Sequence, residues 1–244
     1  MQNTGFVWLG SRRARKWNVA DKGRLLDQAA SAGLPVPSGG ILLDEFYQLL
    51  IRERALEVVD SEVRVPDPEL LLDAVYAGIR FPPIPYPGVI RAICPIDDST
   101  CRRPDAAVAW MPIDLQDAQQ LADGLSKAYS TALTWHRVEE ASGSALRRDL
   151  MLMAMVKAVT SGSATSIRQR AMDEVQHEGQ THVLPRLGFW RSPDASAPPF
   201  LQRLQKLMRG VRRSFGKMDL QVDWIDDGDI CWLIQLRQAT SSVE

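Results

Sequence analysis

Apolar and polar positions alternate most regularly near the end of the chain, on both sides of an acidic turn at residues 226–229. A period of two is typical of a β-strand, so this stretch predicts a β-hairpin with one buried face. The positions predicted to be buried are Leu220, Val222, Trp224, Ile230, Trp232, Ile234 and Leu236. The positions of the other parity that stand out are Asp219, Gln221, Asp223, Gln235 and Arg237.

The second set combines carboxylate, amide and guanidinium groups, which suit a metal ion and a phosphate. Its members share a face across the hairpin only if the loop holds an odd number of residues, as a three-residue loop with a bulge at Asp227-Gly228 does. A simpler interpretation stays open, because antiparallel sheets commonly have one buried and one wet face.

Helical periodicity and local start and stop residues predict five helices, and six strands are expected in all, two of them in this hairpin. Asp67-Pro68 is typical of a helix start and Gly216 of a helix stop. The helices are expected near 20–32, 44–55, 67–79, 115–140 and 199–215, and the strands near 41, 89, 150, 163, 219 and 230. This order predicts an α+β fold, with a loop at 192–199 and a lobe boundary at 140–144.

The closing hairpin carries a resemblance. Its string V-D-W-(x)10-Q-L-R resembles the last hairpin of the nucleotide-binding, ATP-grasp-like domain of pyruvate phosphate dikinase and phosphoenolpyruvate synthase. The resemblance implies that Asp223 and Gln235 hold Mg²⁺ and that Arg237 contacts the transferring phosphoryl group. Two departures are visible: Asp223 stands where the family has Glu, and Gln238 stands where it has Pro.

The N-terminal stretch 19–43 resembles the same family's opening G-G-K-G-A-N-L-x-E-L-x-x-x-G-L-P-V-P-P-G-F-V-I. From the residues alone it predicts a helix that ends near Gly33, a rigid Pro35 to Pro37 segment and a buried strand from Ile41. Lys22 lies at the start of this helix, where an ammonium group can meet a phosphate. The resemblance assigns Lys22 to phosphate contact and catalysis, whereas such a lysine is otherwise usually solvated.

A third stretch, 88–98, resembles the family's V-R-S-S-A-T-A-E-D and places Arg91 on the phosphate-binding arginine. An arginine inside a short apolar strand is costly to bury without an anion. The alternative is an edge-strand arginine that pairs with Asp97 or Asp98. Ala92 and Ile93 replace the family's two serines, and its G-Q-x-E-T segment has no counterpart.

The apolar run 150–159 resembles the family's V-V-V-Q-x-M-V strand, and residues 161–166 resemble its next strand, S-G-V-x-F-T. This places Lys157 and Val159 near the base of the nucleotide, although a buried core strand explains each residue equally well. The family's G-L-G-E segment, which closes over the nucleotide, has no match between Arg168 and Ala197. The lid is therefore expected to be shortened or absent.

Composition narrows the class of protein. The chain has 244 residues, 45% hydrophobic and 24% charged, and it is long enough for one unit of two lobes, 1–140 and 141–244, with a nucleotide cleft between them. Its net charge of -1 provides no electrostatic case for nucleic acid or an anionic membrane. Three cysteines without ligand spacing favour a reducing, cytoplasmic setting.

The resemblance as a whole implies a stand-alone dikinase-type domain that binds Mg-ATP. Such a domain could pass a phosphoryl group to a His on a separate protein or to a small acceptor, because the chain ends directly after Q-L-R and lacks the swivelling phosphohistidine domain and the barrel domain. The alternative is a degenerate, non-catalytic binding or regulatory module. The sequence leaves open whether the domain is an active phosphotransferase.

Overall fold

In the computed structural model, residues 5–60, 62–93, 112–139, 147–188, 190–216 and 218–239 are described. Helices and antiparallel sheets are mixed along these ranges, which confirms the predicted α+β class. The chain forms two compact units: unit 1 holds residues 1–24 and 38–155, and unit 2 holds residues 25–37 and 156–244. The expected lobe boundary at residues 140–144 lies outside the described ranges.

Unit 1 is built on a four-stranded sheet in which all neighbours are antiparallel, in the order β1-β2-β6-β5. Its strands are β1 (Phe6–Trp8), β2 (Gly39–Leu42), β6 (Leu150–Ala154) and β5 (Gly88–Ala92). β2 is buried along its whole length, and β6 is buried except at its last residue, Ala154. The predictions of strands near 41, 89 and 150 are confirmed, but the third strand ends at Ala154 rather than continuing to Val159.

The other elements of unit 1 are η1 (Ala14–Trp17), α2 (Asp44–Arg52), the hairpin β3 (Glu57–Val59) and β4 (Glu62–Arg64), α3 (Pro68–Asp73), the π-helical turn η2 (Ala74–Gly78) and α4 (Ala118–Glu139). α3 begins as predicted. Asp67 is its N-cap, and the side chain accepts hydrogen bonds from the backbone N–H groups of Glu69 and Leu70 at 3.0 and 3.1 Å.

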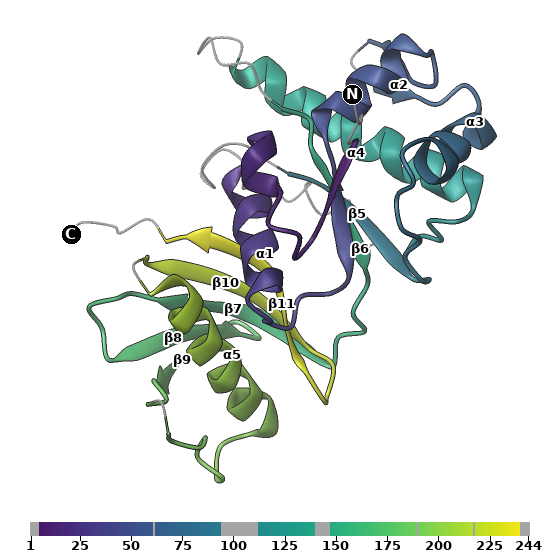
Figure 1. The fold of residues 1–244 in the computed structure, drawn as a ribbon. Coiled ribbons are helices and arrows are strands. Elements are labelled where there is room, and N and C mark those ends of the chain that lie inside the picture. Colours follow the sequence, from purple (N-terminus) through teal and green to yellow (C-terminus); the bar gives the residue numbers. More distant parts are fainter. Residues whose placement is uncertain are drawn as a thin grey trace. The chain divides into compact units, whose positions relative to one another are not determined.

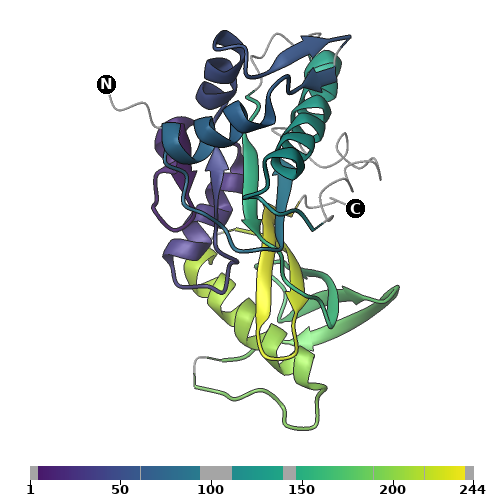
Figure 2. The same ribbon diagram turned by 90° about the vertical axis from the view of Figure 1, so that its right-hand side faces the viewer.

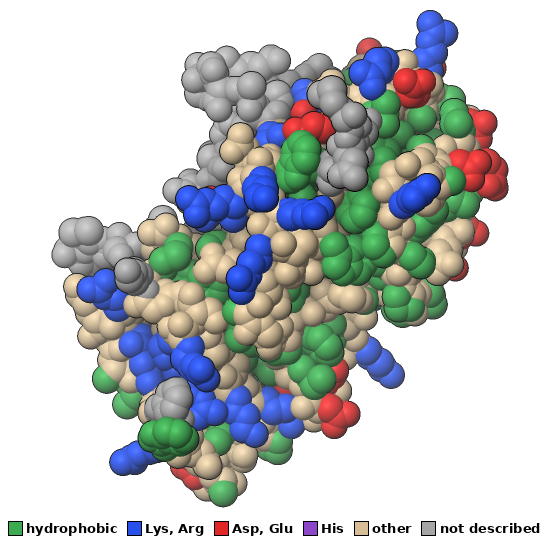
Figure 3. Space-filling view, viewed as in Figure 1, with side chains coloured by type: hydrophobic (Ala, Val, Ile, Leu, Met, Phe, Trp, Pro, Cys, Tyr) green, Lys and Arg blue, Asp and Glu red, His purple; other side chains and the backbone are tan. Residues whose placement is uncertain are grey.

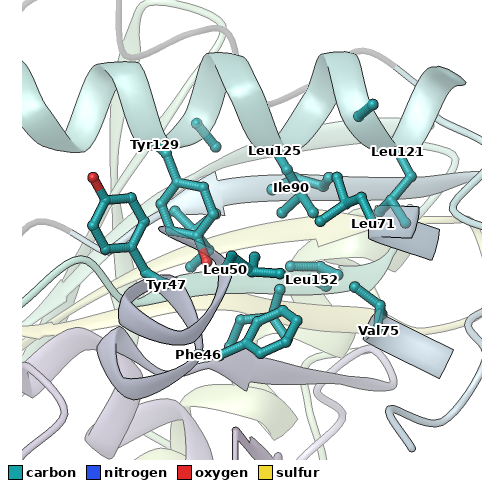
Figure 4. Packing of buried hydrophobic residues seen from close by; sticks show 14 of the residues in the cluster. Phe46, Tyr47, Leu50, Leu71, Val75, Ile90, Leu121, Leu125, Tyr129 and Leu152 are labelled. Carbon is teal, nitrogen blue, oxygen red and sulfur yellow. The ribbon is translucent and has the colours of Figure 1, made fainter. Parts of the chain in front are cut away.

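The core of unit 1 lies where α4 and α2 pack with the sheet. Leu121, Leu125 and Tyr129 follow one side of α4 at a spacing of four residues, and each has an exposed fraction of 0%. Figure 4 shows these side chains directed toward Phe46 and Leu50 of α2. An apolar stripe on each helix therefore accounts for the packing.

A buried carboxylate ties the start of β6 to α2. Asp149 is 1% exposed and accepts a hydrogen bond from the backbone N–H of Asp44 at 2.9 Å. Arg147 bonds both Asp149, at 3.0 Å, and Glu45, at 2.6 Å. The charge of Asp149 is thus compensated, as burial of a carboxylate requires.

Unit 2 is built on a five-stranded antiparallel sheet in the order β11-β10-β7-β8-β9. Its strands are β7 (Thr160–Ser166), β8 (Met172–His177), β9 (Gln180–Pro185), β10 (Leu220–Asp226) and β11 (Cys231–Gln238). The β8–β9 hairpin falls in the stretch where the resemblance places the lid. Its strands were not predicted, because charged and polar residues interrupt their apolar alternation.

Two helices begin and end close to their predicted positions. α1 (Asp21–Ser31) is followed by Gly33, whose φ of +77° explains the glycine, and α5 (Pro199–Phe215) ends at Gly216. α5 packs against β7, β9 and β11 (Figure 1). Its buried side includes Leu204, Met208 and Val211.

Candidate functional site

The hairpin of β10 and β11 contains a β-bulge that sets which side chains share a face. The strands lie side by side in Figure 2, where they are yellow. From the turn, Asp226 pairs with Cys231 and Trp224 with Leu233, but Asp223 pairs with Gln235. Ile234 is therefore an extra residue on β11, and a bulge of this kind re-aims the side chains that follow it.

The bulge aligns the polar residues. The connection 227–230 has an even number of residues, so regular pairing from the turn would place Asp223 opposite Ile234 and Gln221 opposite Leu236. With the bulge, Asp223 lies opposite Gln235 and Gln221 opposite Arg237. Directly opposite residues have Cβ atoms about 4.5–5.5 Å apart, so these side chains form one polar group.

Part of the predicted buried face is wrong, and the even connection is the reason. Cys231 and Leu233 take the core positions, with exposed fractions of 4% and 0%, where Ile230 and Trp232 were expected. Ile230 is 41% exposed, and the Trp232 Nε1–H donates to Asp227 Oδ2 at 2.7 Å. The odd offset was expected in a three-residue loop, but the strand itself supplies it.

The polar face continues onto β7, which the sequence did not single out. Ser163 lies opposite Asp223, and Thr165 lies opposite Gln221, on the side away from β11. The signal was present, because polar residues alternate with the buried Ala164 in this strand. Hydroxyl groups thus stand beside the carboxylate and the amide.

The oxygen groups on this face fit a hard cation. Asp223, Gln235 and Ser163 offer carboxylate, amide and hydroxyl oxygens, the ligand types that Mg²⁺ prefers. No group of three or more His, Cys, Asp or Glu side chains that could hold a metal is present within the described ranges. One carboxylate is nevertheless enough where phosphates and water complete the shell of Mg²⁺.

Arg237 brings a cation to the same face. Its side chain is half-buried, and desolvation lowers the pKa of the guanidinium from its ordinary value. The group still remains charged at neutral pH. Partial removal from water strengthens its attraction to an anion, since Coulomb energies rise as the local dielectric falls.

Two aspartate side chains, Asp226 and Asp227, stabilise the turn of the hairpin. Asp226 is fully buried and receives two hydrogen bonds from Arg203 of α5, both at 2.7 Å. Asp227 accepts from the backbone N–H groups of Asp229 and Ile230 at 2.9 and 2.7 Å. These contacts anchor the end of the hairpin from which the register is counted.

In unit 1, Lys22 is half-buried at the second position of α1. The next residue is Gly23, where a Cβ would come within 2.7 Å of Val19 and 3.1 Å of Ile41 and Ile93. A Cβ here would crowd these side chains, so the first turn of α1 lies close to β2 and to the residue just after β5. Lys22 and Arg91 of β5 therefore lie in the same part of unit 1.

Arg91 is half-buried in β5, opposite Met151. One terminal nitrogen lies 3.3 Å from the Met153 sulfur and 3.8 Å from the Met151 sulfur. Thioether sulfur is a weak acceptor, so an anion would be a stronger partner for this guanidinium. Asp97 and Asp98, the carboxylates of the alternative interpretation, lie outside the described residues.

The remaining predicted residues lie on the connection between β6 and β7. Lys157 is exposed, and Val159 is 72% exposed. The backbone N–H of Val159 donates to the carbonyl of Asp226 at 2.9 Å. The exposure of both side chains excludes the interpretation of 150–159 as one continuous buried strand.

Comparisons with known proteins give structural likeness only. The chain matches no protein-family model, and no curated protein is similar to it in sequence. PH1788 from Pyrococcus horikoshii is similar over 94% of this chain and 97% of its own, with 10% identity and a TM-score of 0.49. No helix in the described part of the chain is long and apolar enough to cross a membrane.

Two further solved structures are similar over most of this chain. A RimK domain protein ATP-grasp from Sphaerobacter thermophilus is 14% identical over 88% of this chain and 57% of its own, with a TM-score of 0.41. D-alanine-D-alanine ligase from Helicobacter pylori is 9% identical over 99% of this chain and 63% of its own, with a TM-score of 0.46. The chain thus spans somewhat more than half of each, and at these scores the likeness carries no argument about activity.

Proposed function

We propose that the chain binds Mg-ATP through the polar face of β10 and β11 in unit 2. Lys22 and Arg91 of unit 1 remain predictions of phosphate contact that the resemblance makes. The observation that carries the proposal is the bulge-set pairing of Asp223 with Gln235 and of Gln221 with Arg237. Exposure of a strand face to solvent would not by itself require these polar residues to lie opposite one another. The alignment gathers oxygen groups suited to Mg²⁺ and a cation suited to phosphate in one place.

The proposed roles follow from the chemistry of each group. Asp223 and Gln235 would hold Mg²⁺, while the phosphate oxygens and water complete its shell. Lys22 and Arg91 would offset charge on the phosphates. Exposed Lys157 and Val159 would border the base.

The chemical step that fits these groups is transfer of a phosphoryl group from ATP to a His on a separate protein or to a small acceptor. The bond from the terminal phosphorus to the bridging oxygen breaks, a bond to the acceptor forms, and ADP leaves. Arg237 would stabilise the charge on the transferring group, which is the main contribution that proteins make to this reaction. The resemblance predicts a catalytic role for Lys22 as well. Mg²⁺, when bound, neutralises charge on the phosphates.

A non-catalytic nucleotide-binding module is the second candidate, and one observation favours it. Ala92 and Ile93 follow Arg91, and Ile93 is only 6% exposed. Its side chain packs in the core where the resembled family has a serine. The loss of hydroxyl donors here would weaken triphosphate binding and phosphoryl transfer more than it would weaken the fold.

Isothermal titration with ATP and ADP, with and without Mg²⁺, tests the proposal. Gln235→Ala and Arg237→Ala should each weaken Mg-ATP binding by at least tenfold, which corresponds to about 1.4 kcal/mol. The matched control is Gln238→Ala, an exposed residue on the same strand, which should leave affinity within twofold. Lys22→Ala tests unit 1 in the same way.

The outcomes separate the candidates. Binding that requires Mg²⁺ and falls in Gln235→Ala but not in Gln238→Ala supports the site. Transfer of the terminal phosphate of radiolabelled ATP to an added His-bearing protein would then distinguish the enzyme from the module. Absence of heat at millimolar nucleotide, together with no thermal shift, would refute nucleotide binding altogether.

A further inference from the structure

Positive charge is concentrated in one segment of unit 2. Residues 186–216 contain seven cationic side chains, Arg186, Arg191, Arg203, Lys206, Arg209, Arg212 and Arg213, and a single acid, Asp194. The segment therefore carries 7 - 1 = +6. Because the whole chain carries -1, the rest carries -1 - 6 = -7, and the near-neutral total conceals this asymmetry.

Within this segment two arginines share one carboxylate. Asp173 of β8 is 1% exposed and accepts hydrogen bonds from Arg186, at 2.8 Å, and from Arg212 of α5. Burial lowers the pKa of Arg212, Asp173 opposes the change, and the nearby charges of Arg186 and Arg209 lower the pKa further. Two positive charges, on Arg186 and Arg212, are thus held beside the single negative charge of Asp173.

The same arginines hold the backbone that carries further cations. Arg186 donates to the carbonyl oxygen of Ile167 at 2.6 Å and to that of Arg168 at 3.5 Å. Arg209 donates to the carbonyl oxygen of Arg191 at 2.9 Å. The backbone carbonyls of Arg168 and Arg191 thus contact arginines of this segment, and the Arg168 and Arg191 side chains are exposed.

An exposed aromatic ring accompanies these cations. Trp190 is 90% exposed, the highest value among the exposed large hydrophobic residues, and it immediately precedes Arg191. Lys206 is exposed on α5. Figure 3 shows Lys and Arg side chains gathered over α5, with few acidic side chains among them. We call Arg168, Trp190, Arg191, Lys206 and Arg213 the cationic face.

We propose that the cationic face binds single-stranded nucleic acid. Arginine guanidinium groups bond phosphates in bidentate fashion, and a row of phosphates matches several cations at once. An exposed tryptophan beside them provides a surface on which an unstacked base can lie. A duplex offers no such base, so the ring favours a single strand.

Charge density favours nucleic acid over an acidic protein. Protein interfaces contain about 56–58% apolar area, whereas nucleic-acid interfaces are far more positively charged. The cationic face has one large exposed apolar side chain, Trp190, among cations. This composition matches a phosphate chain better than a folded protein surface.

The experiment measures fluorescence anisotropy of a labelled 20-nucleotide oligouridylate with the full chain, at 50 to 300 mM salt and without nucleotide. For about four phosphate contacts, log Kd should change with log salt by a slope of about 3. The double variant Arg191→Glu/Lys206→Glu should bind at least tenfold more weakly. The matched control, Arg52→Glu/Arg64→Glu, makes the same charge change at exposed sites of unit 1 and should bind within twofold of the native chain.

Trp190 provides a second test. Trp190→Ala should weaken binding roughly five- to tenfold, since stacking of one base is lost, and Trp190→Phe should retain most of the affinity. No binding at 50 mM salt, or equal binding by the charge-reversed and control variants, would overturn the proposal. Equal competition by polyglutamate of matched length and charge would also overturn it, in favour of an acidic protein partner.

Discussion

Asp173→Asn should be among the most destabilising single substitutions in unit 2. The change keeps the size of the side chain but removes the carboxylate that Arg186 and Arg212 share. The two arginine side chains are 18% and 20% exposed, so both guanidinium groups would remain largely buried without a counter-charge. Removing one partner of a buried ion pair costs about 3–5 kcal/mol.

The lower end of this range is expected, because each arginine retains some exposure and Arg186 keeps its bonds to backbone carbonyls. A loss of about 3 kcal/mol corresponds to a fall in Tm of roughly 6–12 °C for a chain of this length. Urea denaturation followed by circular dichroism measures the free energy of unfolding. Asp194→Asn, an exposed acid of the same unit, is the control and should leave the denaturation midpoint unchanged.

A double-mutant cycle isolates the cause. In an Arg212→Met background, Asp173→Asn leaves one guanidinium without its carboxylate instead of two, so its cost should fall by about 1 kcal/mol or more. If Asp173→Asn alone costs less than about 1 kcal/mol, the shared ion pair does not hold the sheet to α5, and the reasoning about the cationic face loses its structural basis.

Three further predictions concern other parts of the chain. Asp67→Ala removes the N-cap of α3 and should lower the free energy of unfolding by about 1 kcal/mol in urea denaturation, so an unchanged midpoint would contradict the capping role. The hydrogen bond from Arg147 lowers the pKa of Glu45, so this ion pair stabilises the fold at neutral pH and is lost as pH falls through the carboxyl range. Glu45→Gln should therefore be less stable than the native chain at pH 7, and thermal melts should show that the difference in Tm closes toward pH 3. Burial and the nearby Asp226 raise the pKa of the Cys231 thiol, so in a chain whose other two cysteines are serine, iodoacetamide at pH 8 should label it only after unfolding, and rapid labelling of the native chain would show that the site opens.

Local sequence signals located most helices and strands. Asp67-Pro68 begins α3, Gly33 follows α1, and Gly216 ends α5, because each conformation depends on a few neighbouring residues. Alternation over Leu220 to Trp224 correctly marked the buried face of β10. The hairpins β3–β4 and β8–β9 were missed, since their strands are short or interrupted by charges and gain stability from their neighbours.

The polar face of the candidate site depended on facts that no local pattern contains. The residues Asp223, Gln235 and Arg237 could be named from the sequence, but the bulge at Ile234 that aligns them depends on strand pairing. Ser163 joined them only because β7 pairs with β10. Side-chain periodicity is a property of one strand, whereas register is a property of two.

The positions of the charged side chains also depended on the tertiary structure. Composition established a net charge of -1, and the sum is insensitive to where each charge lies. The packing of α5 against the sheet brought Arg186 and Arg212 to one carboxylate from positions 26 residues apart in the chain, and it left Trp190 exposed beside Arg191. Helix and strand identity therefore followed from neighbours in sequence, while register, shared faces and the sharing of Asp173 by two arginines followed from contacts between separate segments.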